Sequence, residues 1–453
     1  MAVTQGLTQE LGHFLADVVA NGVPAAVREA AKDGMIDCIG CMVAGSGDEA
    51  VTLALRVFPS VAPSPLPSLS APSRLWLSGR RASVTDAAML NGIAAHVLDY
   101  DDSCLRGHPS AVLMPAILAI ADARQASGAA MIDAYVAGYE VWAELVDREA
   151  GFHQMKGWHP TGIFGAIGAA AAAAVLYRLD AGQAAHALGL AASQSAGLMS
   201  NFGAMSKSFH VGRAAQAGVV AAQLAAVGFT ASPDALEHPR GFLMAVSPQG
   251  AVDTDRAADG LGKTWQLAAR RVNLKKYPTC YYTHRALDAV LALVREQPVA
   301  PDAVERVEVT LSKEHALALR NAQPQTALAA KFSMQFAMAC ALVSGKVGLL
   351  ELTDACVQRA DIQALMRRVA IVPDDRYDAE TPGAAHEDRV TLFGKDGSVR
   401  TKAVHRASGH AQHPLDAGAV RAKFLDCLAY GGYAGDAAAL YERLARLEDQ
   451  PAP

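Results

Sequence analysis

The pattern of hydrophobic and polar positions changes its character once along the chain, near residue 268. Before that point, apolar residues recur at helical spacing in segment after segment, and Gly, Pro, Ser and Asp stand at the segment ends. The clearest of these segments are 8–20, 25–45, 85–99, 130–150 and 180–198. Strand signals are nearly absent, apart from a short pair in "SRLWLSGRRAS", residues 73–83. The pattern predicts a large helical domain over residues 1–268.

After residue 268 the period of the pattern becomes shorter. Residues 304–313, "VERVEVTLSK", alternate with period two, and residues 367–375 do so less cleanly. Residues 387–404 predict a hairpin with "KDGS" at its turn. Helical segments lie between these strands, at 283–297 and 329–345. We therefore predict an α+β domain over 269–402, inserted before C-terminal helices at 403–453 that return to the helical domain. The predicted fold class is mainly α with this smaller α+β domain.

Composition narrows the choice of partners. The chain has 453 residues, of which 51% are hydrophobic and 19% charged, and its formal net charge is −5. This balance lacks the basic excess of a nucleic-acid-binding protein. Two alanine-rich stretches, 162–177 and 217–229, are shorter than the ~20 apolar residues that a membrane span needs. We expect them to be buried helices, and we expect neither nucleic acid nor a membrane as a partner.

The N-terminal residues and the cysteines indicate in which cellular compartment the protein is located. The sequence "MAVTQGLTQELGHFLADVV" has no basic n-region and no cleavage site, so it predicts no signal peptide. Seven cysteines are scattered along the chain, an odd number that suits a reducing cytoplasm. Cys38 and Cys41 form a single C-x-x-C inside an apolar segment. We expect them to be core cysteines rather than a redox or zinc pair.

The first candidate for a functional site is the stretch "HVLDYDDSCLRGHPS", residues 96–110. Three aspartates stand within four positions, and His96 and His108 flank them. Apolar segments on both sides predict buried helices. Acidic groups at the edge of an apolar core cost free energy unless they are paired, hydrogen-bonded or ligated. The stretch is therefore a candidate site that needs partners from elsewhere in the chain.

Four places in the chain put a basic side chain just before a helix or in its first turns. These residues are His108, His159, Lys207 with His210 and Arg213 following it, and Lys275 beside Lys276. Helix N-termini carry free N–H groups and partial positive charge, so a cation there opposes helix stability. The arrangement makes sense if an anion binds between these groups. It predicts a site for a small anionic molecule.

A carboxylate-bearing substrate fits this pattern. Its charge needs cations and N–H groups, and breaking a bond beside a carboxylate needs a proton-transfer group and stabilisation of the resulting carbanion. Histidine can act as acid or base near neutral pH. An aspartate behind it can orient the ring, and we assign that orienting role to Asp99, behind His108.

Several stretches together resemble the MmgE/PrpD family, which includes 2-methylcitrate dehydratase, cis-aconitate decarboxylase and iminodisuccinate epimerase. They are "NGIAAHVLDYDDSCLRGHPSAVLMPAILA", "VAGYEVWAEL", "GWHPTGIFGAIGAAAAAA", "SKSFHVGRAAQAGVVAAQLAAVGFT", "KKYPTCYYTHRALDA", "AKFSMQFAMACAL" and "VRAKFLDCL". They run in family order over most of the chain. The resemblance implies a helical domain with an α+β lid, a homodimer, and a reaction on a small polycarboxylate without metal or organic cofactor.

The resemblance also implies site residues. The active-site positions proposed for the family fall on Asp99, Ser103, His108, His159, Lys207 and Lys275. Lys207 and Lys275 would bind substrate carboxylates, with Arg213 and His210 beside them, while the two histidines move protons. Ser103 stands where the decarboxylase branch has threonine, and the stretch from Asp99 to His108 is one residue shorter than in that branch.

The sequence leaves other functions open. Dehydration or decarboxylation of a tricarboxylate and epimerisation of the iminodisuccinate type all pass through a carbanion beside a carboxylate, so the same residues could serve each. The "DYDD" string also occurs in terpene cyclases, where such aspartates protonate the substrate or bind Mg²⁺. A metal site at His96, Asp99 and His108 is a further alternative, although its ligand spacing is not compact. We predict no metal ligands among the site residues.

Overall fold

The chain forms two compact units in the computed structural model. The described residues are 6–58, 72–76, 78–379 and 383–451. Unit 1 comprises Met1–Val272 together with Ala417–Pro453, and unit 2 comprises Asn273–Asp416. The sequence pattern had put the corresponding boundaries after residues 268 and 402.

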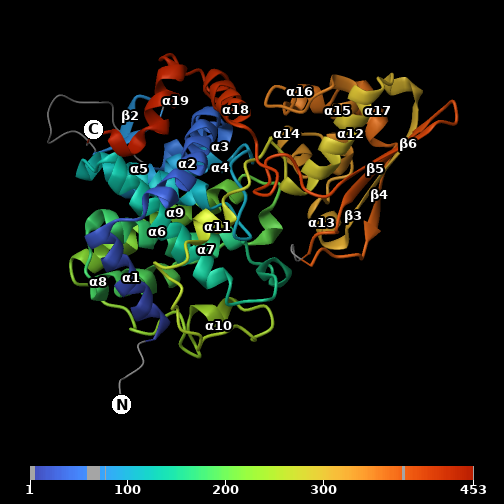
Figure 1. Ribbon diagram of the computed structural model, residues 1–453. Helices are drawn as coiled ribbons and strands as arrows, with labels where there is room; N and C mark the ends of the chain where they lie inside the picture. The colour runs from blue at the N-terminus through green and yellow to red at the C-terminus, as the bar shows by residue number, and fades with distance from the viewer. Residues whose placement is uncertain (1–5, 59–71, 77, 380–382, 452–453) are drawn as a thin grey trace. The chain divides into compact units, whose positions relative to one another are not determined.

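Unit 1 is a bundle of helices (Figure 1). Its long helices are α1 (Leu7–Asn21), α2 (Ala25–Gly45), α3 (Glu49–Val57), α4 (Val84–His96), α5 (Pro109–Arg124), α6 (Gly128–Val146), α7 (Pro160–Tyr177), α8 (Ala181–Ala192), α9 (Ser206–Ala226), α18 (Ala417–Tyr430) and α19 (Ala437–Ala445). Shorter helices are α10 (Phe242–Val246), α11 (Gln266–Arg270) and the 3₁₀ turns η2 (His153–Lys156), η3 (Met199–Asn201) and η6 (Leu447–Asp449). The predicted short strand pair is present as β1 (Ser73–Leu75) and β2 (Arg80–Ala82), with Leu77 of the same stretch outside the described residues.

Helix α7 lies at the centre of this bundle. It is the one unbroken helix in the described part of the chain that is long and apolar enough to cross a membrane; α2 and α3 pass the same test together but are bent by 81°. In the structure, 94% of the α7 segment is buried among other helices of the unit. It packs against α5, α6, α8 and α9. This burial agrees with the prediction that the alanine-rich stretch is a core helix.

Small residues let the central helices approach one another closely. A Cβ atom added at Gly218 of α9 would lie 2.4 Å from the Ala169 Cβ on α7. A Cβ at Gly212, one and a half turns earlier, would lie 2.4 Å from the Met89 carbonyl oxygen on α4. Real Cβ atoms do not come so near, because the repulsion would force the helices apart. The glycines therefore set the spacing at which α9 fits between α4 and α7.

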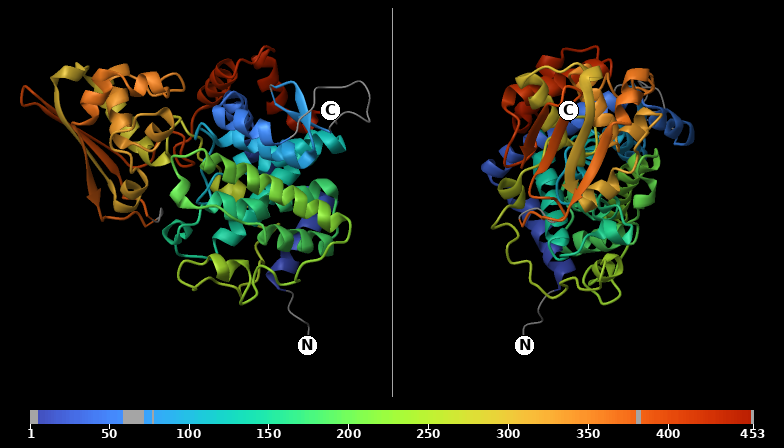
Figure 2. Two further views of the ribbon diagram at one scale, coloured as in Figure 1. Left: turned by 180° about the vertical axis from the view of Figure 1, so that it is seen from behind. Right: turned by 90° about the vertical axis from the view of Figure 1, so that its right-hand side faces the viewer.

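The two C-terminal helices pack on α2, far away in the sequence, and the red and blue segments lie side by side in both views (Figure 2). The packing of α18 on α2 is tight where Gly40 faces Phe424, since a Cβ on Gly40 would lie 3.2 Å from that ring. Phe424 is only 2% exposed. The end of the chain is thus part of the core of unit 1.

Unit 2 holds a four-stranded sheet with helices packed against it. Its strands are β3 (Val304–Ser312), β4 (Val369–Asp374), β5 (Asp388–Gly394) and β6 (Val399–Val404), in the order β4-β3-β5-β6. Its helices are α12 (His284–Glu296), α13 (Lys313–Ala318), α14 (Ala327–Ala330), α15 (Met334–Ser344), α16 (Asp354–Val357) and α17 (Ala360–Met366), with 3₁₀ turns η4 (Tyr281–Thr283) and η5 (Pro301–Ala303).

The topology of unit 2 follows from its connections. β3 and β4 are parallel, and helices α13 to α17 form the crossover between them. β5 and β6 form the predicted antiparallel hairpin around "KDGS". Helix α12 packs on β5 and β6, and α15 packs on β4. The predicted fold class, mainly α with a smaller α+β part, is confirmed.

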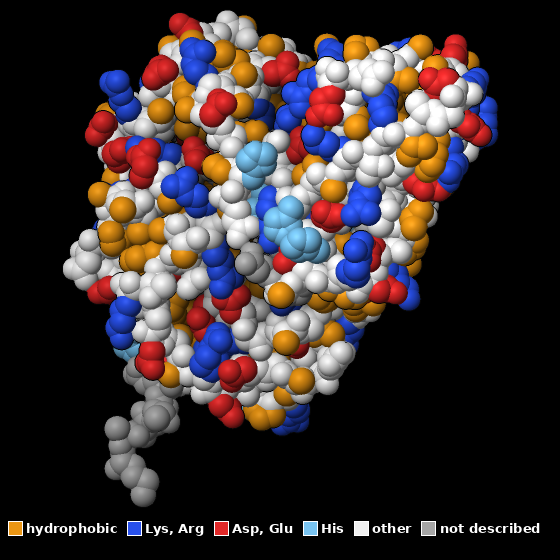
Figure 3. Space-filling model, turned by 45° about the vertical axis from the view of Figure 1, so that its right-hand side comes forward, with side chains coloured by type: hydrophobic (Ala, Val, Ile, Leu, Met, Phe, Trp, Pro, Cys, Tyr) orange, Lys and Arg blue, Asp and Glu red, His pale blue; other side chains and the backbone are white. Residues whose placement is uncertain are grey.

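The surface carries both signs of charge. On the face drawn in Figure 3, acidic and basic side chains are interspersed. This agrees with the small formal charge of −5, and the face shows no broad basic patch of the kind that tracks a nucleic-acid backbone.

Candidate active site

The loop between α4 and α5, residues 97–108, has a strained backbone. Asp99, Leu105 and Arg106 all have left-handed φ angles, of 53°, 49° and 60°. Side chains with a Cβ avoid this region, and such residues persist only where the surrounding structure holds them. Three of them in one short loop indicate that the loop is shaped for a purpose other than stability.

Contacts from α6 and the segment after it hold the loop in this shape. The Trp142 indole donates a hydrogen bond to the Leu105 carbonyl (3.2 Å). The Arg106 guanidinium donates to the carbonyls of Glu149 (2.9 Å) and Gly151. Because both groups bond to main-chain atoms, they fix the backbone between the aspartates and His108.

Lys207, in the first turn of α9, reaches the beginning of this loop. Its Nζ lies 2.6 Å from Asp99 Oδ1 and 2.7 Å from His96 Nε2. Burial, together with the Lys207 charge and despite Asp101, lowers the pKa of His96 to about 3. His96 is therefore neutral near pH 7, and its Nε2 accepts a hydrogen bond from the lysine.

Asp101 joins the two histidines that flank the loop. Its carboxylate oxygens lie 2.9 Å from His96 Nδ1, and Oδ2 lies 3.2 Å from His108 Nδ1. His108 Nδ1 is also 2.7 Å from the Asp102 carbonyl. Burial by itself would raise the pKa of Asp101, but attraction to both histidines outweighs it and holds the pKa well below its ordinary value. The carboxylate therefore stays ionised behind His108.

Asp102, the next residue, has the opposite character. It is fully buried, and burial together with repulsion from Asp101 and Asp37 raises its pKa well above the ordinary value. Burial and the neighbouring carboxylates therefore favour its protonated form. The pKa values of the adjacent aspartates shift in opposite directions because Asp101 faces imidazoles and Asp102 faces carboxylates.

His159 brings a second imidazole group to the cluster. It is the N-cap of α7, and its Nδ1 lies 3.1 Å from His210 Nδ1 on α9. Burial and the Lys207 charge lower its pKa well below the ordinary value, so the ring is neutral. Its Nε2 is buried and has no hydrogen-bond partner among the described residues. A buried, unpaired ring nitrogen is unusual in a purely structural histidine.

Three helix N-termini belong to this group. α5 begins directly after His108, α7 directly after His159, and α9 carries Lys207 in its first turn. The ring centroids of His96 and His108 are 4.5 Å apart, and those of His96 and His159 are 6.3 Å apart. Free N–H groups at the helix starts and the lysine charge make this part of unit 1 attractive to a carboxylate.

The same cluster has the ligand atoms of a metal site. Single ligand atoms of His96, Asp99, Asp101 and His108 all lie within 4.8 Å of one another. The Lys207 ammonium, however, already bonds to Asp99 and His96. A protein cation thus stands beside two of the four ligands that a metal would need.

A second group in unit 2 has ligand atoms equally close together: Asp378, His386 and His405. Here the Arg406 guanidinium donates a hydrogen bond to Asp378. The carboxylate that a metal would need most is thus already paired with a cation. His405 Nδ1 hydrogen-bonds with the His386 carbonyl oxygen.

The remaining predicted site residues lie in three different places. Ser103 is half-buried in the same loop, between Asp102 and Cys104. Arg213 hydrogen-bonds to Gln216, which in turn donates to Asp86 (3.2 Å) in the first turn of α4. Asp86 is ten residues from His96 on α4, and Arg213 is six residues from Lys207 on α9, so Arg213 bonds at a place more than one helical turn away from the cluster. Lys275 belongs to unit 2, where it is fully buried.

Two residues of the cluster were not assigned a role from the sequence. The Asp101 carboxylate lies 3.2 Å from His108, and Asp99 contacts Lys207. His96 was considered only as a metal ligand, yet it lies between Asp101 and Lys207. Both residues lie in the 96–110 stretch, which the sequence analysis had selected as a candidate site. The spacing of residues along the sequence could not predict which side chain contacts which.

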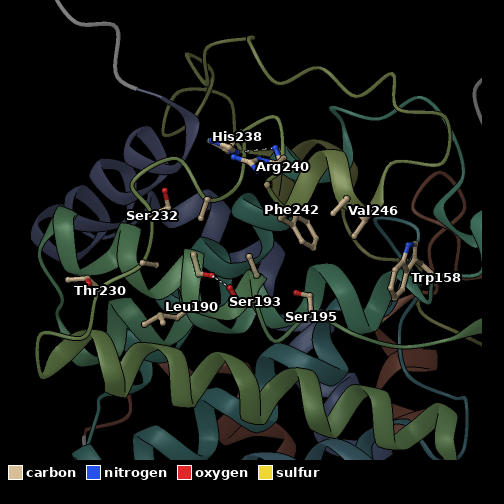
Figure 4. Close-up of a pocket in the computed structure, with 16 residues that line it drawn as sticks. Trp158, Leu190, Ser193, Ser195, Thr230, Ser232, His238, Arg240, Phe242 and Val246 are labelled. Atoms are coloured by element: carbon tan, nitrogen blue, oxygen red, sulfur yellow. Dashed lines mark hydrogen bonds between the residues drawn. The ribbon is translucent and has the colours of Figure 1, made fainter.

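Unit 1 also has a pocket of about 700 Å³, with Trp158 in its wall (Figure 4). Trp158, Ser195 and Phe242 line it, together with residues of α8 and of the 230–246 segment. Its lining contains none of the residues predicted for the site. Trp158 precedes His159 in the chain, so the pocket wall adjoins the segment that carries this histidine.

Comparison with known proteins identifies the family. A model of the MmgE/PrpD N-terminal domain matches residues 9–255, and a model of the MmgE/PrpD C-terminal domain matches residues 277–447. The chain belongs to the MmgE/PrpD family. The second match covers most of unit 2 and continues into the C-terminal helices of unit 1.

The relatives that match are decarboxylases. Cis-aconitate decarboxylase of Mus musculus is 26% identical over 442 residues, covering 93% of this chain and 86% of the relative. The Homo sapiens enzyme is 28% identical over 361 residues (76% and 72%), and that of Aspergillus terreus strain NIH 2624 is 24% identical over 432 residues (89% and 86%). The predicted family and enzyme class, an MmgE/PrpD lyase, are confirmed. These findings favour neither the epimerase nor the terpene-cyclase alternative.

Proposed function

We propose that this enzyme decarboxylates a small tricarboxylate, cis-aconitate or a close analogue. The observation that carries the proposal is the grouping of Lys207, His108 and His159 at three helix N-termini. Relatives that cover almost the whole chain are named for this reaction. Dehydration of a related hydroxy-tricarboxylate would use the same groups.

The positive groups would hold the carboxylates of the substrate. The N-termini of α5 and α7 offer N–H groups, and Lys207 supplies a full charge beside them. We assign Lys275 to a second carboxylate of the substrate, as the family resemblance implies. None of these roles requires a metal ion or an organic cofactor.

The histidines would transfer protons. In the proposed reaction, the bond between the substrate and one carboxylate breaks, and CO₂ leaves. The electron pair stays on the substrate carbon, where conjugation with a neighbouring carboxylate spreads the charge. His108, backed by Asp101, would give a proton to the carbanion and regain one from water. Neutral His159 would accept or orient a hydrogen bond through Nε2.

The assembly and compartment complete the proposal. We propose a homodimer, as the family resemblance implies. We also propose a cytoplasmic location, since all seven cysteines are free. Cys38 and Cys41 are buried core residues, as expected from their apolar segment.

One experiment decides between the reactions open to the family. The purified protein is incubated separately with cis-aconitate, 2-methylcitrate and iminodisuccinate in deuterated water, and products are followed by NMR. We expect CO₂ release from cis-aconitate, with one solvent deuteron incorporated into the product. Turnover of iminodisuccinate alone, or of 2-methylcitrate alone, would overturn the proposal in favour of epimerisation or dehydration.

A further inference from the structure

Helix α18, the first of the two C-terminal helices, carries a buried lysine that contacts the active-site loop. Lys423 is 7% exposed, and its Nζ lies 2.6 Å from Asp37 Oδ1 on α2. The same Nζ donates a 2.8 Å hydrogen bond to the carbonyl oxygen of Tyr100 and lies 4.0 Å from the centre of the Tyr100 ring. One ammonium therefore connects α2, α18 and the loop.

Tyr100 is the residue between the two ionised aspartates of the site. Asp99, just before it, has a left-handed backbone and bonds to Lys207. Asp101, just after it, holds His96 and His108. The Tyr100 carbonyl belongs to the peptide group that joins Tyr100 to Asp101. Because this group is planar, the position of the carbonyl oxygen also fixes the position of the Asp101 nitrogen and Cα.

We propose that Lys423 is a positioning residue of the active site: it holds the Tyr100 peptide so that Asp99 and Asp101 reach their separate partners. Catalysis by this enzyme would then depend on the C-terminal helix, although that helix contributes no group to the substrate. The effect on turnover rests on the proposed function, whereas the effect on the loop does not.

The electrostatics fit this role. Burial alone would lower the pKa of Lys423, but the attraction of Asp37, together with that of Cys41 and Tyr100, outweighs it, and the pKa lies above its ordinary value. The ammonium is therefore charged near neutral pH. A charged donor makes a stronger hydrogen bond to a carbonyl than a neutral one. Misplacing a reacting group by about 1 Å can cost roughly a hundredfold in rate.

The test must remove the lysine without leaving a buried charge behind. Replacing one partner of a buried ion pair leaves the other uncompensated, whereas replacing both by apolar residues is often tolerated. The variant is therefore the double change Lys423→Met with Asp37→Leu. The matched control is Lys32→Met with Glu448→Gln, because that pair (2.6 Å) also ties α2 to the C-terminal segment but does not contact the loop.

Two quantities are measured on each folded variant: hydrogen–deuterium exchange of residues 97–108, and kcat and KM with cis-aconitate well below the melting temperature. For the Lys423/Asp37 variant we expect faster exchange in the loop and a kcat lower by a factor of about ten to a hundred. The control should change neither, whatever its melting temperature.

Each outcome decides the matter. Unchanged exchange, or faster exchange with an unchanged kcat, would overturn the positioning role. If the wild type does not turn over cis-aconitate, the proposed function fails, and loop exchange alone judges Lys423. Should the double variant not fold, Lys423→Arg decides instead. It keeps the ion pair with Asp37 but cannot place a nitrogen at the same point, so an unchanged kcat and loop exchange in it would also refute the proposal.

Discussion

Asp101 and Asp102 are neighbours in the chain and both are buried, yet their pKa values shift in opposite directions. This allows a paired experiment: Asp101→Asn and Asp102→Asn. Asn has nearly the shape of Asp but no charge. The pKa of Asp101 lies well below its ordinary value and that of Asp102 well above it, so we expect the first change to remove more charge than the second.

The size of the Asp101 effect follows from its contacts. Its carboxylate contacts the Nδ1 atoms of His96 and His108, at 2.9 Å and 3.2 Å. A hydrogen bond to a charged group contributes about 1.5–3 kcal/mol, so the two together contribute roughly 3–6 kcal/mol. Since about 1.4 kcal/mol corresponds to a factor of ten, we expect kcat of the Asp101→Asn variant to fall by about 10²–10⁴. Asp102→Asn should change kcat by no more than about threefold.

The assay is steady-state decarboxylation of cis-aconitate at pH 7, with circular dichroism to establish that each variant is folded. The double variant Asp101→Asn with His108→Ala should be little slower than His108→Ala alone, because residues that act as a unit are not additive. Equal losses from the two Asn variants, or a larger loss at Asp102, would refute the assignment of charges. Additive losses in the double variant would refute the pairing of Asp101 with His108.

Four further outcomes are expected. Lys207→Ala and Lys275→Ala should each raise KM about tenfold to a hundredfold with the fold intact, and unchanged kinetics in both would show that the carboxylates bind elsewhere. Turnover should survive EDTA and dialysis; loss restored by Mg²⁺ or Zn²⁺ would revive a metal mechanism. Gly218→Ala should lower the melting temperature by several degrees, because its Cβ would meet Ala169 at 2.4 Å. The folded-state pKa of Asp101 is below its unfolded value of about 3.9, so this residue stabilises the fold at neutral pH and loses that effect as the pH falls below about 4. Thermal scans of the wild type between pH 7 and pH 3 should therefore lose more stability than scans of Asp101→Asn.

The helices and strands were largely predictable, because hydrophobic period depends on local sequence. The helical segments of unit 1 and the 387–404 hairpin appear where the pattern put them. The exact end of unit 2 was not predictable in the same way. Residues 403–416 belong to unit 2 through long-range bonds, such as Leu274 N–H to the Gly409 carbonyl and Ala411 N–H to the Asn273 side chain. Periodicity carries no information about such bonds.

The candidate site was located from the sequence, but its internal pairing was not. The 96–110 stretch and the basic groups at helix starts pointed to His108, His159 and Lys207, which the structure brings together. The sequence analysis put Asp99 behind His108. In the structure the Asp99 backbone is left-handed and its carboxylate bonds to Lys207, and two residues later Asp101 also lies against the histidine. A left-handed backbone at a residue other than glycine cannot be predicted from the amino-acid composition or from the period of the hydrophobic pattern.

The cost of burying a charge explains why the aspartates near the site are paired with particular cations, which the sequence could not show. Inside unit 1, two aspartates near the site form ion pairs with lysines: Asp99 with Lys207, and Asp37 with Lys423. For Asp102, burial and repulsion from Asp101 and Asp37 outweigh its hydrogen bonds to Ser110 and raise its pKa. Burial makes an uncompensated charge so costly that the partner, rather than the residue type, decides the charge. These lysines come from α9 and α18: Lys207 is 108 residues away from Asp99, and Lys423 is 323 residues away from Tyr100. The aspartates of the stretch therefore depend on two histidines of the stretch itself and on lysines of helices far away in the sequence.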